Sequence, residues 1–173
     1  MTLTNTTLLI TATTTALMAG LFFAWSCSVT IGIARLPDAE YIAAMQAMNR
    51  AIQNPVFLLC FLGTGVLLPL STYLHYHQPL SVRFWLLLAA TALYLIGVLG
   101  VTFVGNIPLN EALDKFQLQS ASVQEIATQR VKFEEPWNSL TTVRTVTSIL
   151  AIVLVIMACM SPTDIENFPK PIK

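Results

Sequence analysis

Arg144 is the residue whose type and position most clearly predict chemistry. It stands about one helical turn inside an apolar segment that begins near Leu140. A charge in such a segment snorkels to the membrane surface, pairs with an acid, or points into a polar cavity. If it points inward, Arg144 offers a fixed positive charge to an anionic ligand or reaction intermediate.

Two asparagines, Asn106 and Asn110, bracket the sequence Ile107-Pro108-Leu109. Their four-residue spacing places both amides on one helix face if the helix continues through Pro108. Two amides on one face are suited to an oxygen-rich ligand. The alternative is that they satisfy backbone groups that the proline frees at a helix end.

Trp137 and Asn138 come shortly before Arg144. A tryptophan at that depth commonly anchors a helix at the membrane interface. Asn138 and Arg144 are six residues apart, so they need not share a helix face. Carboxylates flank these positions, and any of them that folds over the helices is a candidate proton acceptor: Glu111, Asp114, Glu134 and Glu135.

Histidine and cysteine give little support for a metal site or for redox chemistry. His75 and His77 diverge on a helix at this spacing and have no third ligand nearby, so we expect interfacial histidines rather than a metal site. Cys27, Cys60 and Cys159 each stand alone in an apolar segment, without a Cys-x-x-Cys pair. They are expected to be buried free thiols, which weighs against a thiol oxidoreductase.

These residues need helices to position them, and the composition predicts that the helices cross a membrane. Hydrophobic residues make up 55% of the 173-residue chain and charged residues 10%, whereas a soluble domain has roughly 25% charged residues. Four stretches are long and apolar enough to span a bilayer: about 8–34, 55–74, 84–105 and 140–160. We therefore predict an all-α, four-helix transmembrane bundle that forms one integral membrane domain over residues 1–173.

Further expectations follow from this arrangement. Both termini should lie on one side of the membrane. The first span lacks the basic patch that precedes a signal peptide, so it is expected to remain as a membrane helix, and its hydroxyls should face protein. The zero net charge makes nucleic acid an unsuitable partner.

The two longer connections are predicted to be amphipathic helices on the other side, over about 38–54 and 108–135. Apolar residues recur at helical spacing from Tyr41 to Ile52, and this stripe either lies on the membrane or covers the mouth of the bundle. Pro108 either kinks the third span or begins a new helix. Ser122 and Glu125 match a capping box for a short helix that ends before Pro136.

Four segments in this order resemble the anthrone oxygenases, a family of small four-span membrane proteins long catalogued as a domain of unknown function. The resemblance extends along most of the chain. Its segments are Gly20-Leu21-Phe22-Phe23-Ala24, Met45-Gln46-Ala47-Met48-Asn49-Arg50 leading to Asn54-Pro55, Asn106-Ile107-Pro108-Leu109-Asn110, and Trp137-Asn138 with Arg144.

The resemblance implies a monooxygenase that converts anthrones to anthraquinones with molecular oxygen and without a cofactor, and the sequence contains no recognised cofactor motif. A base would remove an acidic carbon-bound proton, and the resulting anion would react with oxygen. The implied catalytic residues, which stabilise the anionic oxygen, are Arg144, Asn106, Asn110 and Asn138. Trp137, Asn49 and Asn54 are the implied substrate contacts. The base stays unassigned, because His75 lies on the opposite side and Glu111 is merely nearby.

Two other functions compete with this one. A non-enzymatic membrane subunit or assembly factor would use its amphipathic helices to dock a partner, and its polar groups would satisfy one another without a ligand-sized cavity. A small transporter is disfavoured because no span carries a central acid. For the enzyme we expect membrane lipids and a hydrophobic small molecule as partners, and the cell (inner) membrane as its location.

Overall fold

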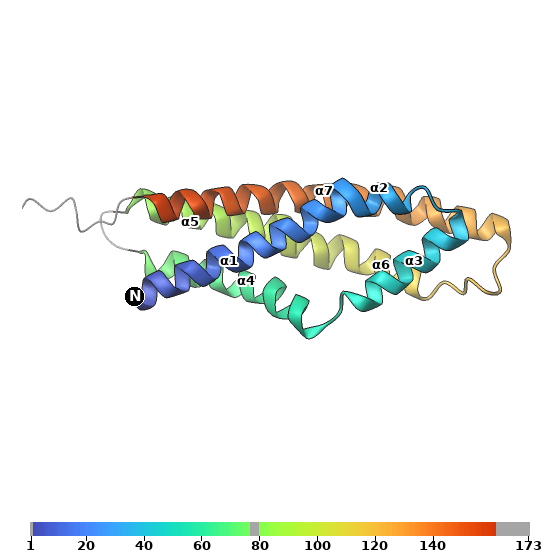
Figure 1. Cartoon of the computed structure of the whole chain (residues 1–173), viewed down its shortest axis with the longest axis horizontal. Helices are drawn as coiled ribbons and strands as arrows, with labels where there is room; N and C mark the ends of the chain where they lie inside the picture. Colours follow the sequence, from blue (N-terminus) through green and yellow to red (C-terminus); the bar gives the residue numbers. More distant parts are fainter. Residues whose placement is uncertain (1, 77–79, 162–173) are drawn as a thin grey trace, which may run out of the picture.

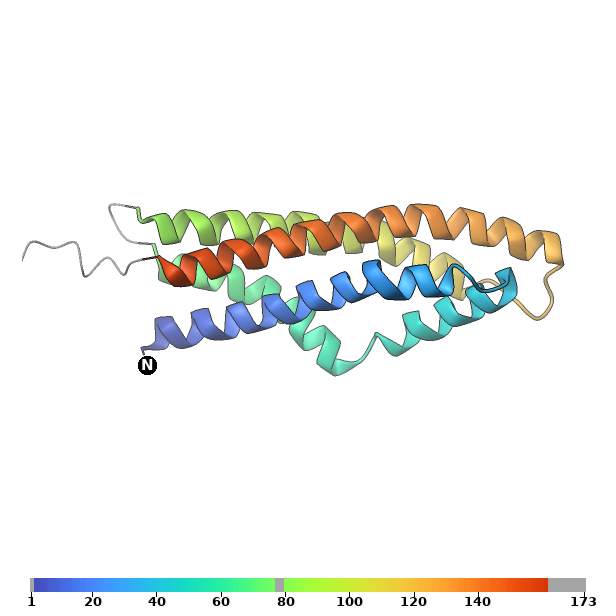
Figure 2. The same cartoon turned by 45° about the horizontal axis from the view of Figure 1, so that its top comes forward.

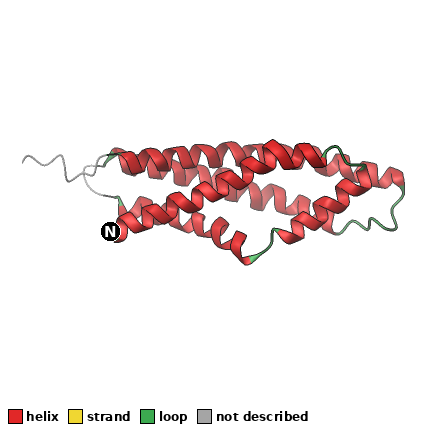
Figure 3. Ribbon diagram, in the orientation of Figure 1, coloured by secondary structure: helices red, strands yellow, loops and turns green. Residues whose placement is uncertain are grey.

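The described part of the chain forms four long helices and one short one. The computed structural model describes residues 2–76 and 80–161, and this part contains helices and no strand (Figure 3). All four long helices are apolar enough to cross a membrane, and they cover Leu3–Ile33, Pro55–Leu74, Val82–Asp114 and Val123–Met160. The chain is therefore a multi-pass integral membrane protein with an all-helical bundle, as the sequence predicts.

Two of the long helices contain π-helical segments. The first consists of α1 (Leu3–Ala24), η1 (Trp25–Val29) and α2 (Thr30–Ile33). The third consists of α5 (Val82–Ala92), η2 (Leu93–Gly100), η3 (Thr102–Asn106) and α6 (Ile107–Asp114). The second and fourth are single helices, α4 (Pro55–Leu74) and α7 (Val123–Met160), and the short helix is α3 (Asp38–Ala51).

Side-chain caps explain where several helices begin. The side chains of Thr2, Asn54, Ser81 and Ser122 each accept a hydrogen bond from the backbone N–H three residues later. Such caps satisfy N–H groups that have no partner inside the helix. At Ser122 the carboxylate of Glu125 also accepts from the Ser122 N–H, which confirms the predicted capping box.

The ends of the bundle differ, as Figure 1 shows. The beginning of α1, the end of α4, the beginning of α5 and the end of α7 lie together at one end. At the other end lie α3 and the turn between α6 and α7. We call this second end the connection end. The first described residues and the end of α7 thus lie at the same end of the bundle, as expected if both termini are on one side of the membrane.

Two clusters of buried apolar side chains hold these parts together. The first, which we call the membrane core, consists of Leu8, Met18, Phe22, Phe61, Leu68, Leu87, Ala90, Tyr94, Val98, Ala151, Val155 and Ala158. The second, the connection-end core, consists of Tyr41, Ile42, Met45, Leu113, Phe133 and Trp137. The stripe predicted on α3 thus packs against α6 and α7. Figure 2 shows α3 beside these helices at the connection end.

Polar and small residues bring the membrane helices into close contact. Thr11 in α1 and Ser71 in α4 share a hydrogen bond of 2.7 Å, and Ser26 and Thr145 share another of 2.7 Å. These bonds show that Thr11 and Ser26 of the first span face protein, as predicted, whereas Thr13 and Ser28 are exposed. At Gly97 an added Cβ would lie 2.5 Å from Cγ2 of Thr147, so α7 passes directly over this glycine.

The predicted boundaries of the second connection, about 108–135, are wrong. The third long helix continues through Pro108, and α7 continues through Pro136. α7 runs through Pro136, which frees only the carbonyl of Lys132, and that residue is exposed. At Pro108, the preceding Ile107 N–H bonds to the carbonyl of Thr102 at the end of a π-helix, so the missing N–H falls where the bonding pattern changes. Residues 108–114 and 123–135 therefore extend two spanning helices.

The expected burial of the cysteines is also wrong for two of the three. Cys60 is half-buried, whereas Cys27 and Cys159 are exposed on the bundle. An apolar helix in a membrane can turn an apolar side chain toward lipid, so a cysteine in such a helix need not be inside the protein. All three are free thiols.

Candidate functional site

A cavity of about 480 Å³ lies in the half of the bundle next to the connection end. Its size is within the range of roughly 300–1,000 Å³ that is usual for small-molecule sites. The apolar wall comes mainly from the first two spans and includes Leu21, Phe22, Trp25, Phe57, Leu58, Phe61 and Leu62. The polar wall comes from α3, α6 and α7 and includes Asn49, Arg50, Asn110, Glu111, Asp114, Lys115 and Arg144.

Arg144 is a buried cation on this wall. Its side chain is placed on the inner face of α7, and the residue is 7% exposed. Nη2 donates to the hydroxyl of Thr141 at 2.7 Å, and Nη1 lies 3.5 Å from the hydroxyl of Thr102. Within residues 2–76 and 80–161 it forms no ion pair with a carboxylate, and its Nε has no hydrogen-bond partner.

Aromatic rings take the place of a carboxylate around this guanidinium. Its central carbon lies 4.9 Å from the ring centre of Phe22 and 5.5 Å from that of Trp137. The negative faces of aromatic rings attract a cation, by about 0.5–2 kcal/mol for each contact. These rings hold Arg144 in place without neutralising its charge, so a ligand in the cavity meets a full positive charge.

Trp137 is fixed by its neighbours. Its Nε1 donates to Oδ1 of Asn110 at 2.8 Å, and its ring lies between those of Trp25 and Phe133, at 5.5 Å and 5.9 Å between ring centres. The residue is 4% exposed. This indole is therefore buried and hydrogen-bonded inside the protein and is not an anchor in the membrane interface.

Two further asparagines carry buried amide groups without partners. Asn49 lines the cavity, and its Nδ2 has no hydrogen-bond partner in the described part of the chain. Asn106 is 1% exposed and neither of its amide atoms has such a partner. It lies one turn from Thr102 and one turn from Asn110, both on the cavity wall. An unpartnered buried polar group costs about 1–3 kcal/mol, a cost that hydrogen bonding to a polar ligand removes.

The structure places Asn138 and Asn54 away from this cavity. Asn138 lines a shallow hollow on another side of α7, together with Glu134 and Glu135. Six residues correspond to a rotation of about 240° around a helix, so Asn138 cannot share a face with Arg144. The Asn54 side chain accepts from the N–H of Phe57 at 3.0 Å as the cap of α4.

The mouth of the cavity toward the connection end is charged. Arg50 on α3 donates to Asp114 on α6, with 2.6 Å between Nε and Oδ1. Both side chains are about half exposed or more, so this ion pair contributes little stability. Glu111 and Lys115 stand beside it on α6.

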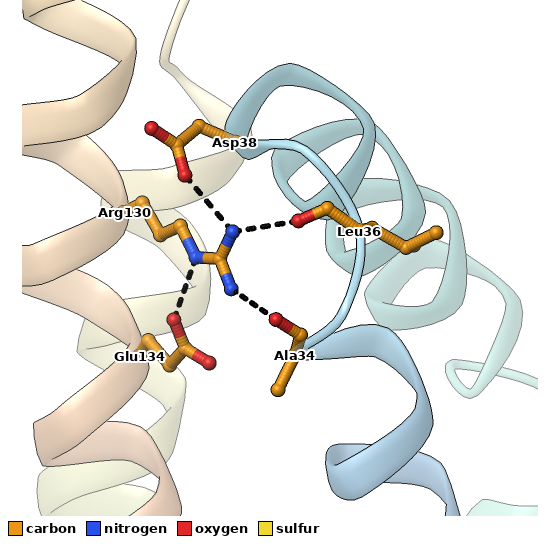
Figure 4. A network of polar contacts seen from close by, with 5 residues as sticks. All are labelled: Ala34, Leu36, Asp38, Arg130 and Glu134. Carbon is orange, nitrogen blue, oxygen red and sulfur yellow. Dashed lines mark hydrogen bonds and ion pairs between the residues drawn. The ribbon is translucent and has the colours of Figure 1, made fainter.

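A network around Arg130 positions α3 against α7, and the sequence analysis did not anticipate it (Figure 4). The guanidinium donates to the carbonyl oxygens of Ala34 at 2.7 Å and Leu36 at 2.8 Å, and pairs with Asp38 at 2.9 Å and Glu134 at 2.7 Å. The four-residue spacing of Arg130 and Glu134 was the one signal in the sequence, because such pairs meet on a helix. The network joins the turn before α3 to α7.

His75 does not line the cavity. It directly follows α4, and its Nδ1 donates to the carbonyl of Ser71 at 2.7 Å. His77 lies outside the described residues. In the part of the chain that the structure describes, no three His, Cys, Asp or Glu side chains are grouped as metal ligands would be.

Comparison with known proteins identifies the family. A family model described as anthrone oxygenase matches residues 45–154. The matched region contains the second half of α3, all of α4 and the third long helix, and most of α7. It includes Asn49, Asn106, Asn110, Trp137 and Arg144. No curated protein and no solved structure matches the chain. Because the match covers more than half of its length, the chain belongs to the anthrone oxygenase family.

Proposed function

We propose that this protein is a membrane oxygenase that oxidises a hydrophobic aromatic substrate of the anthrone type with molecular oxygen and without a cofactor. The observation that supports it most is the environment of Arg144, a buried cation that faces a ligand-sized cavity with no carboxylate partner among the described residues. Keeping an unpaired ion out of water costs several kcal/mol. A ligand that carries or develops negative charge offsets this cost.

The wall of the cavity suits a flat apolar molecule that arrives from lipid. Leu58, Leu62 and Phe103 line the cavity and are also exposed on the outside of the bundle. We infer that the substrate enters from lipid between these side chains. Membrane lipids are the expected surroundings and the cell (inner) membrane is the proposed location.

In the proposed reaction the protein acts mainly by stabilising an anion. Removal of a proton from the carbon that is oxidised leaves an anion whose charge spreads to the substrate oxygen. Arg144 stabilises that oxygen by charge, and the free amide nitrogen of Asn49 on the cavity wall is available as a donor, whereas Asn106 does not line the cavity. Trp25 and Trp137, both on the cavity wall, provide apolar contact for an aromatic substrate. The electron-rich anion then reacts with oxygen directly.

The competing function, a membrane subunit without activity, fits the site less well. It predicts polar groups that satisfy one another and no ligand-sized cavity. The observed cavity of about 480 Å³ and the unpartnered atoms of Arg144, Asn49 and Asn106 favour a ligand-binding site.

Turnover of an anthrone by membranes that contain the protein tests this proposal. Wild-type membranes should form the quinone, followed by its absorbance, and consume oxygen in equal amount. Arg144→Met should reduce kcat by about 100-fold to 1,000-fold, the usual effect of removing an oxyanion stabiliser. Arg35→Met is the matched control, because it removes the same charge from an exposed position outside the cavity.

Two outcomes would contradict the proposal. Unchanged turnover by Arg144→Met would remove Arg144 from the chemistry. Absence of oxygen-dependent product with wild-type membranes, with the protein shown to be present, would reject an anthrone as substrate.

A further inference from the structure

The cavity wall holds five ionisable side chains in the described part of the chain. They are Arg50, Glu111, Asp114, Lys115 and Arg144. Only the two carboxylates accept a proton at neutral pH, because lysine and arginine are already protonated there. If a side chain of the cavity wall is the base in the proposed reaction, it is therefore Glu111 or Asp114.

The two carboxylates differ in whether they form an ion pair. Oδ1 of Asp114 accepts a hydrogen bond from Nε of Arg50 at 2.6 Å, so this carboxylate is already engaged in an ion pair. The side chain of Glu111 forms no ion pair or hydrogen bond with any residue in 2–76 or 80–161. Glu111 is thus the carboxylate on the wall that is free to take a proton.

We propose that Glu111 is the general base of this site and later returns the proton as general acid. This inference rests on the oxygenase function proposed above and adds the residue that starts the reaction. Carboxylates elsewhere do not compete, because Glu134 and Glu135 line the separate hollow on α7.

The position of Glu111 relative to Arg144 fits the substrate proposed. Glu111 is nine residues beyond Thr102 on the same long helix, and the Thr102 hydroxyl lies beside the guanidinium of Arg144. Nine residues correspond to roughly 13 Å along a helix. In an anthrone the acidic CH₂ group and the carbonyl oxygen are at opposite ends of the central ring. A base and a cation that approach from opposite ends of the cavity match that arrangement.

The exposure of Glu111 also suits a group that exchanges protons. The residue is exposed at the mouth of the cavity beside Lys115, toward the connection end. A carboxyl group there is in contact with water, which also gives the water molecule formed in the last step a way out of the site. Arg144 is buried deeper, where its interaction with an anion is less screened.

The carboxylate of Glu111 takes one proton from the CH₂ carbon of the anthrone. The C–H electron pair is delocalised onto the carbonyl oxygen of the substrate, beside Arg144. This anion is oxidised by molecular oxygen: a C–O bond forms and the oxygen is reduced to a peroxide anion, which takes the proton back from Glu111. Loss of the second C–H proton to Glu111 breaks the O–O bond and releases hydroxide, which takes that proton. The products are the quinone and one molecule of water.

Replacement of Glu111 by glutamine removes the base and keeps the size of the side chain. Glu111→Gln should reduce kcat by about 100-fold to 10,000-fold, the usual contribution of a general base. Binding of the anthraquinone product, followed by quenching of tryptophan fluorescence, should be unchanged. Glu135→Gln is the matched control, because it removes one carboxylate outside the cavity. Glu111→Asp should recover part of the lost turnover.

The pH dependence distinguishes a base from a structural residue. An anthrone ionises by itself in alkaline solution, so turnover by Glu111→Gln should rise with pH toward that of the wild type. Arg144→Met should show no such recovery, since it lacks the stabilising charge rather than the base.

The results separate this inference from the function on which it rests. Inactive wild-type membranes would reject the oxygenase function. An active wild type with an equally active Glu111→Gln would reject only the role of Glu111. That role would also be rejected if Glu111→Asp were no better than Glu111→Gln, or if alkaline pH failed to restore turnover.

Discussion

Replacement of Arg130 by methionine should release the turn before α3 from α7. Arg130 is the one side chain that joins the carbonyl oxygens of Ala34 and Leu36 with the carboxylates of Asp38 and Glu134 (Figure 4). Methionine retains an apolar side chain of similar length and removes all four interactions. The turn then loses its polar attachment, whereas the apolar contacts of α3 stay.

The size of the effect follows from these contacts. A hydrogen bond from a charged donor is worth about 1.5–3 kcal/mol when buried, and we take about 1 kcal/mol for each carbonyl because water replaces part of it. Partly exposed ion pairs contribute about 0.5 kcal/mol each. The two carbonyl bonds and the two ion pairs together stabilise the closed turn by about 3 kcal/mol. Since about 1.4 kcal/mol corresponds to a tenfold change, protection from exchange should fall roughly a hundredfold.

Hydrogen exchange measured by mass spectrometry in nanodiscs tests this magnitude directly. Peptides that cover residues 34–41 should exchange roughly a hundred times faster in Arg130→Met, because exchange reports the free energy of local opening. Peptides from α4 should be unchanged. Arg35→Met, an exposed arginine in the same turn, is the matched control.

Equal exchange of residues 34–41 in Arg130→Met and the wild type would refute the reasoning, because the network would then contribute no stability to the turn. Faster exchange throughout the bundle would refute it differently, by showing that Arg130 supports the whole fold. With the expected local effect, turnover should also fall, because α3 carries Asn49 and Arg50 into the cavity.

Two further predictions concern packing and pH. Gly97→Val should separate α7 from the third helix, because even a Cβ would lie 2.5 Å from Cγ2 of Thr147. The midpoint of thermal unfolding in detergent should therefore be lower than in the wild type. An unchanged midpoint would contradict the close approach of the two helices. Tyr41 in α3 is buried and lies near Glu134, and both effects raise the pKa of its hydroxyl above its ordinary value of 10.0, with the Arg130 cation opposing them. The unfolded chain therefore loses this proton first, and the folded state should lose stability as pH rises above about 10. Tyr41→Phe should show a smaller loss in alkaline unfolding experiments, and an identical loss would contradict this cause.

The four spanning helices were predictable because membrane insertion depends on the length and composition of each segment alone. The cap at Ser122 was equally predictable, since its partner Glu125 lies three residues away, whereas Asn54, expected to contact substrate, is the cap of α4. The stripe on α3 was visible as a period, but the choice between membrane surface and bundle mouth depends on contacts with α6 and α7 that are distant in sequence.

The site was predicted in part. Arg144 and Asn110 stood out because polar groups are costly in an apolar segment, and both line the cavity. Asn138 was grouped with them by sequence proximity, although a helix that continues through Pro136 turns it elsewhere. The bond between Trp137 and Asn110 joins residues 27 positions apart, and no local pattern indicates it. The unpartnered state of Glu111 likewise emerges only from the three-dimensional packing.

The length of α7 places the two cores in different solvents. Its 38 residues extend about 57 Å, whereas the hydrocarbon of a bilayer is roughly 30 Å thick. The membrane core therefore forms in lipid. Transfer of an apolar side chain from lipid into the protein gains little free energy, because lipid chains are equally apolar. The connection-end core extends toward water, where its burial is driven by the hydrophobic effect. Urea should therefore unfold the connection-end core while the spanning helices remain assembled. In urea the protein should then behave as two units, one in water and one in the membrane, that α7 joins as a continuous helix.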